Sequence, residues 1–169
     1  MNALASSFRA IGVTQHFAAM ALACAVALGL ALGAQYVFEM RPCPWCILQR
    51  LIFIVIGLLC LIGALLAARP VRIACAGATF TLALLGAAAA LWQHNVAAKS
   101  SSCNLTLADK VLNALGVEAL WPTLFQVTAN CADSAVRVLG VAFEHWSLAL
   151  YLLLGIGAAS AFLKFRAPA

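Results

Sequence analysis

Residues 51–68 read LIFIVIGLLCLIGALLAA, an apolar run that contains no Lys, Arg, Asp or Glu. A helix of about 20 such residues crosses the hydrocarbon core of a bilayer. Three further stretches of the same kind lie at about 16–38, 73–92 and 147–163. Helices satisfy their own backbone polar groups in lipid, and the chain shows no alternating barrel pattern. The sequence therefore predicts an all-α membrane protein, a bundle of four transmembrane helices.

The composition excludes the water-soluble classes. Hydrophobic residues make up 66% and charged residues 9% of the 169 residues, whereas a soluble domain carries about 25% charged residues. A net charge of +5 on so apolar a chain is typical of cations that flank membrane spans, not of a phosphate-binding face. We therefore expect one four-span domain over residues 1–169 and no nucleic-acid partner. A cleaved signal peptide at residues 1–34 is the less favoured alternative, because the apolar run exceeds a usual signal core.

The loops fall on two sides of the membrane. Four crossings place both termini on one side, together with the turn at Arg69 and Arg72, and leave loops 39–50 and 93–146 on the other. The terminal side carries its cations in short flanks, where the positive-inside rule counts most. Both termini are therefore expected in the cytoplasm and both loops in a periplasm. A short amphipathic helix over Leu107–Leu115, lying on the membrane surface, is expected in the longer loop.

The cysteines divide by position. Three lie within predicted spans, where a thiol behaves as a small hydrophobe, namely Cys24, Cys60 and Cys75. The other four all lie in the loops of one face, namely Cys43, Cys46, Cys103 and Cys131. Disulfides persist in oxidising compartments and are rare in cytosol. The segregation of the four loop cysteines therefore supports a periplasmic face.

Cys43-Pro44-Trp45-Cys46 is a C-x-x-C pair directly before a predicted helix, and Pro44 suits the first helical turn. Helix N-termini favour the thiolate, which is the attacking species in disulfide exchange. The position therefore favours a redox pair. The alternatives are two purely structural disulfides, or a zinc site completed by Cys103 and Cys131, which form no second C-x-x-C. We expect no metal site.

Arg50 lies four residues after Cys46, one helical turn deeper into an apolar span. An ionised side chain there is costly unless it extends to the interface or binds something. Arg50 is therefore either a membrane-flanking residue whose side chain extends to the water, or a cation that holds an oxygen-bearing acceptor beside the reactive sulfur. Trp45 either lines the pocket that would hold this acceptor or anchors the helix at the membrane interface.

Together these residues resemble the DsbB-type disulfide bond formation proteins of Gram-negative inner membranes. The shared features are four spans, C-x-x-C-x-x-x-Arg at the start of the second span, a distant cysteine pair, and Trp121-Pro122 before the last cysteine. The resemblance covers essentially the whole chain. It implies a thiol:quinone oxidoreductase of the bacterial inner membrane that oxidises a DsbA-like periplasmic thiol oxidase and reduces ubiquinone or menaquinone.

The resemblance also implies an electron path through the four loop cysteines. Cys103 would take the mixed disulfide with the partner, and Cys131 would be the leaving thiol. Cys131 would then pass electrons to the inner pair through Cys43. Cys46 would donate to a quinone held beside Arg50.

Three histidines bear on this interpretation. Some proteins of the resembled type carry a quinone-linked histidine near the outer end of the third span, where this chain has Ala89 and Ala90. The nearby candidates are Gln93 and His94, and His94 is taken as a weaker cofactor-binding candidate. His16 and His145 lie near predicted helix ends and are expected to be solvated.

The rival interpretation comes from a different functional class. It is a non-catalytic four-span scaffold whose disulfides only brace the outer loops. Structural disulfides resist reduction, whereas catalytic ones exchange readily with a partner. Arg50 and the helix-start position of the C-x-x-C pair favour catalysis, because a brace requires neither.

Overall fold

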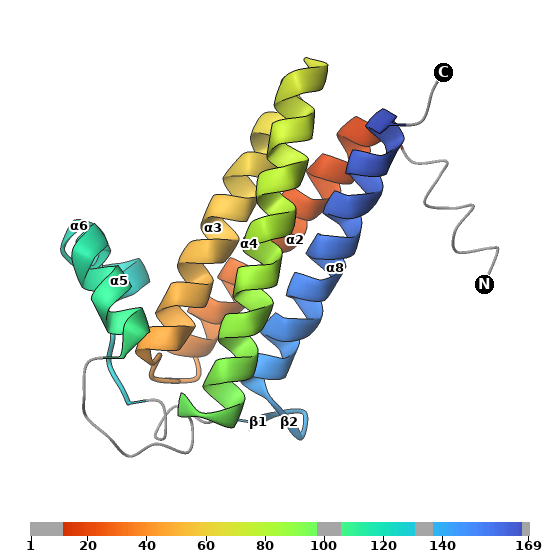
Figure 1. Cartoon of the computed structure of the whole chain (residues 1–169). Helices are drawn as coiled ribbons and strands as arrows, with labels where there is room; N and C mark the ends of the chain where they lie inside the picture. The colour runs from red at the N-terminus through yellow and green to blue at the C-terminus, as the bar shows by residue number, and fades with distance from the viewer. Residues whose placement is uncertain (1–11, 98–105, 131–136, 167–169) are drawn as a thin grey trace.

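The protein is described by a computed structural model that covers residues 12–97, 106–130 and 137–166. Four long helices form a bundle (Figure 1), namely α2 (Val13–Tyr36), α3 (Pro44–Leu65), α4 (Arg69–Asn95) and α8 (Phe143–Arg166). Each of the four is long and apolar enough to cross a membrane. The prediction of an all-α, four-helix membrane protein is confirmed.

The predicted spans overlap the observed helices, but their boundaries differ. Helix α3 begins at Pro44, so that Cys46 and Arg50 belong to the helix and not to a loop over 39–50. The backbone N–H of Cys46 donates to the sulfur of Cys43, which occupies the N-cap, and Pro44 occupies the first helical position. Charge-free runs mark the apolar middle of each span, whereas capping residues decide where the helix begins.

Short elements connect the long helices at the end of the bundle that carries the cysteine pair (Figure 1). They are α5 (Leu107–Leu115), α6 (Val117–Leu120), α7 (Pro122–Phe125) and a hairpin of β1 (Arg137–Val138) and β2 (Val141–Ala142). Helix α5 has the predicted bounds. The side chains of Thr106 and Asp109 cap its start, and Gly116 ends it in the left-handed conformation, at φ 62°.

Helix α5 and helix α7 lie against the first turns of α3. Leu112 and Phe125 form a small apolar cluster with Ile47. Leu115 and Trp121 remain exposed. The placement of α5 on a membrane surface stays a prediction.

Helix α3 lies between α2 and α4, and α8 packs mainly on α4. Tyr151 of α8 joins three of these helices. Its ring stacks on Phe53 with a centroid distance of 4.2 Å, and its hydroxyl donates to the carbonyl of Gln49 at 2.9 Å. A Cβ added at Gly86 of α4 would overlap the same ring. The absence of a side chain at Gly86 therefore allows α4 and α8 to approach closely.

Buried polar groups also occur at the opposite end of the bundle. The expectation that His16 is solvated is wrong, because its side chain is 5% exposed and its Nε2 lies 3.1 Å from the hydroxyl of Ser160. Helix α2 begins at Val13, so that His16 already lies inside the bundle. His145, by contrast, is exposed as expected.

Candidate redox site

The C-x-x-C pair occupies the first turn of α3. Cys43 is fully buried and Cys46 is partly buried. The two sulfur atoms lie 2.9 Å apart, and a disulfide bond measures about 2.05 Å. The pair can therefore open and close as a disulfide within one helical turn.

Two buried amides connect the sulfur of Cys46 to the neighbouring helix. Gln93 of α4 donates from Nε2 to Cys46 Sγ at 3.3 Å. Gln49 of α3 donates from Nε2 to Gln93 Oε1 at 2.6 Å. The second bond holds the oxygen of Gln93 away from Cys46, so that the N–H group faces the sulfur. A donor in this place stabilises negative charge on that atom.

Arg50 is buried one helical turn below Cys46. Arg50 is only 5% exposed, so that its side chain does not extend to the water as a membrane-flanking arginine would. Its Nη1 donates to the side-chain oxygen of Gln35 at 2.9 Å and to the carbonyl of Leu124 at 2.5 Å. Its Nε has no hydrogen-bond partner within the described part of the chain. Arg50 therefore joins α2, α3 and α7.

A cavity of about 700 Å³ adjoins these groups, which is within the usual range of about 300–1,000 Å³ for small-molecule sites. Its polar wall contains Cys46, Gln49, Arg50 and Gln93. Most of the remaining wall is apolar and comes from α2, α3 and α8, including Leu30, Phe53 and Leu150. The reactive sulfur, a buried cation and two amides thus share one largely apolar pocket.

The other predicted site residues are placed differently. Cys103 and Cys131 lie outside the described residues. His94 lies in the last turn of α4, bonds Glu144 at 2.8 Å, and is not among the residues that line the cavity. Trp45 is buried with Cys43 beside α4, and does not line the cavity either. Of the predicted residues, the structure brings Cys43, Cys46 and Arg50 together.

Sequence reasoning missed Gln49 and Glu144. Both line the cavity, and both are buried. The available signal for Gln49 was a neutral amide in an apolar helix, which requires a partner inside the bundle. Gln93 was named with His94 as a candidate for the position of the quinone-linked histidine, but its contact with Cys46 was not anticipated.

Comparison with known proteins identifies the family. The family model "DsbB: Disulfide bond formation protein DsbB" matches residues 14–161. Disulfide bond formation protein B 1 of Pseudomonas savastanoi pv. phaseolicola is 33% identical, over 81% of this chain and 82% of that protein. Disulfide bond formation protein B of Herminiimonas arsenicoxydans is 32% identical, over 82% and 87% respectively. The corresponding protein of Dechloromonas aromatica is 32% identical, over 83% and 87%. The chain, whose C-x-x-C pair begins the second of four membrane helices, belongs to the DsbB family of disulfide-generating oxidoreductases.

Proposed function

We propose that the chain oxidises a DsbA-like periplasmic dithiol protein by thiol-disulfide exchange and passes the electrons to a membrane quinone, either ubiquinone or menaquinone. One observation carries this proposal. Cys46 lies in the wall of a mostly apolar cavity that also contains the buried cation Arg50. A disulfide that only braced a loop would require neither the cavity nor the cation.

The residues of the cavity fit a quinone. A quinone presents two carbonyl acceptors on a flat ring and carries an apolar tail. The guanidinium of Arg50, which lines the cavity, can donate to one such carbonyl. Apolar side chains of α2 and α8, among them Leu30 and Leu150, offer a surface for the tail. A bound quinone would supply an acceptor for two electrons and two protons.

The outer pair, Cys103 and Cys131, is proposed to receive the electrons first. A thiolate of the partner attacks Cys103, and Cys131 leaves as a thiolate. The second thiol of the partner then closes its own disulfide and releases Cys103. Each exchange conserves the number of disulfide bonds, because one sulfur enters as another leaves.

The inner pair is proposed to be reduced by the outer pair. Cys131 attacks Cys43, which gives a transient mixed disulfide and releases Cys46 as a thiolate. The N–H of Gln93 and the Arg50 cation stabilise that charge at the cavity wall. Cys103 then resolves the mixed disulfide and leaves Cys43 reduced. Loss of two electrons and two protons closes the Cys43-Cys46 disulfide again.

We further propose that the chain acts as one four-span domain in the bacterial inner membrane, with its termini in the cytoplasm. The inner cysteine pair lies at the same end of the bundle as α5 and the β-hairpin (Figure 1). Disulfide bonds persist in oxidising compartments and are rare in the cytosol. This end of the bundle is therefore proposed to face the periplasm.

The test is quinone reduction by the purified full-length protein in detergent. Quinone absorbance is followed after a reduced DsbA-like protein is added. The wild type should convert quinone to quinol in proportion to the dithiol added, and Cys46→Ser should not. Cys75→Ser is the matched control, because Cys75 is buried in α4 away from the cavity. It should retain turnover.

A second arm distinguishes catalysis from misfolding. Cys46→Ser should still form a mixed disulfide with the partner through the outer pair. Failure of the folded wild type to reduce quinone, when it is offered both quinone and the dithiol protein, would favour the disulfide-braced scaffold. Normal turnover by Cys46→Ser would remove Cys46 from the path.

A further inference from the structure

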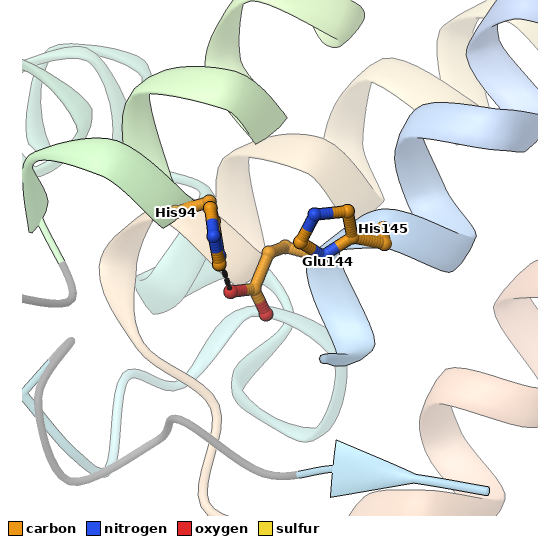
Figure 2. Close-up of side chains that lie close together, drawn as sticks. All are labelled: His94, Glu144 and His145. Carbon is orange, nitrogen blue, oxygen red and sulfur yellow. Dashed lines mark hydrogen bonds and ion pairs between the residues drawn. The ribbon is translucent and has the colours of Figure 1, made fainter. Parts of the chain in front are cut away.

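Three side chains of types that commonly bind metals lie close together where α4 ends and α8 begins (Figure 2). His94 lies in the last turn of α4, and Glu144 and His145 lie in the first turn of α8. The Nδ1 of His94 is 2.8 Å from Oε1 of Glu144. One ligand atom from each of the three residues lies within 4.8 Å of the other two. From this geometry we propose that the three residues form a binding site for a divalent transition-metal ion.

The ligand set selects the class of ion. Two imidazoles and one carboxylate with an open fourth position are typical of zinc sites, and imidazole also suits copper, iron and nickel. Zinc-to-ligand bonds of about 2.0–2.1 Å place ligand atoms about 3.3 Å apart in a tetrahedron. The His94 and Glu144 atoms are already closer than this. Both histidines reach solvent, so that their rings can rotate to complete the site.

The electrostatics of the cluster also favour a cation. The Glu144 side chain is 6% exposed, and within the described part of the chain its carboxylate has one hydrogen-bond partner, His94. A buried carboxylate requires compensation for the water it has lost. A divalent ion compensates for more of this lost hydration than an imidazole does.

The site is distinct from the proposed redox path, although it adjoins it. None of its three residues is a cysteine, and only Glu144 lines the cavity. The proposal departs from the expectation of no metal site, which considered only the cysteines as ligands. Because thiolates also bind these metals, the test must separate the two ligand types.

Cobalt(II) provides that separation. Full-length protein in detergent, with its loop cysteines oxidised, is titrated with CoCl2, and Zn²⁺ is then added as a competitor. The expected result is one saturable site with weak visible bands from nitrogen and oxygen ligands. Sulfur-to-cobalt charge transfer in the near ultraviolet should be absent. Zinc should displace the cobalt.

Substitutions assign the ligands. His145→Ala and Glu144→Gln should each weaken cobalt binding by at least about tenfold, since even loss of an outer-shell partner costs about that much. His145 is exposed, so that His145→Ala should not disturb the bundle. Glu118→Gln removes the same charge from α6, where the carboxylate accepts from the Val127 N–H. This matched control should bind cobalt as the wild type does.

Three results would overturn the proposal. They are wild-type affinity in His145→Ala, a spectrum dominated by sulfur charge transfer, and no cobalt binding by the folded wild type. Each of these results would leave His94 and Glu144 as a hydrogen-bonded pair and not as ligands of one three-residue metal site.

Discussion

Gln93 of α4 donates a hydrogen bond to the sulfur of Cys46 in α3 across 3.3 Å. Gln49, three residues after Cys46, fixes the orientation of the Gln93 amide by donating to its oxygen. The sulfur is thus held from a second helix and not only by its own first turn. Any change in the contact between α3 and α4 should therefore reach the reactive atom.

Gln93→Leu should slow the chemistry of Cys46. The substitution removes a donor to the sulfur, and a hydrogen bond to a charged group contributes about 1.5–3 kcal/mol. Alkylation of Cys46 by iodoacetamide in the reduced protein should therefore slow by about tenfold. The buried Gln49 amide would lose its partner, which should lower the free energy of unfolding by about 1–3 kcal/mol. Mass spectrometry and unfolding in mixed micelles measure the two effects.

The matched control for Gln93→Leu is Gln126→Leu. Gln126 is exposed after α7, so that both quantities should stay at the wild-type values. An alkylation rate in Gln93→Leu equal to that of the control would show that the amide does not assist the sulfur.

Arg50→Leu should affect the quinone more than the protein partner. The substitution removes the guanidinium from the cavity wall and should raise the KM for quinone by about tenfold or more. The KM for the dithiol protein should change little. Arg50→Lys keeps the charge but loses the fork that bonds Gln35 and Leu124, so that its KM for quinone should be intermediate. Equal losses toward both substrates would indicate misfolding.

Gly86→Ala should destabilise the bundle by overpacking. The new methyl group would overlap the Tyr151 ring, and such insertions cost about 1–3 kcal/mol. Gly77→Ala is the control on the same helix, because nothing lies within 4 Å of a Cβ at Gly77. It should be neutral or stabilising by up to about 1 kcal/mol. Unfolding in mixed micelles measures both.

A double variant tests the cause of that effect. Tyr151→Leu empties the space over Gly86, so that Gly86→Ala should cost less in the double variant than alone. If the two changes in the free energy of unfolding were simply additive, the cost of Gly86→Ala would not come from overlap with the Tyr151 ring.

Thr106→Ala should loosen α5 without loosening the four long helices. The side chain of Thr106 caps the helix by accepting from the Asp109 N–H at 3.3 Å, and loss of such a cap costs about 1 kcal/mol. Hydrogen exchange of the α5 amides should therefore become faster. Thr128→Ala, at an exposed position after α7, should leave exchange unchanged. Equally faster exchange in α3 would contradict a local role for the cap.

The parts of the fold that depend on local sequence could be predicted. Apolar runs gave the four spans, Pro44 was predicted at a helix start, and the amphipathic pattern of the longer loop gave the bounds of α5. The importance of Arg50 also followed from its position, because a charge in an apolar helix needs a partner. The end of α3 and the start of α4 did not follow, since α3 stops at Leu65, inside the predicted span 51–68, and α4 begins at Arg69, before the predicted span 73–92.

The contacts between helices could not be predicted in the same way. Gln49 and Gln93 are 44 residues apart, and His94 and Glu144 are 50 residues apart. Whether such side chains meet depends on how each helix is rotated about its own axis and on how deep it lies in the membrane. The hydropathy of the sequence determines neither quantity. His16 shows the same limit, because a position near a helix end gave no sign that Ser160 would face it.

The side chain of Tyr151 has a consequence for how the protein is made. Chains are synthesised from the N-terminus, so that α8 is the last of the four long helices to leave the ribosome. Its tyrosine then packs on Phe53, bonds the carbonyl of Gln49 and lies over the bare backbone of Gly86. A nascent chain that has inserted only the three earlier helices therefore has Cys46 beside a pocket that still lacks the wall contributed by α8. Insertion of α8 completes that wall and fixes α3 and α4 relative to each other.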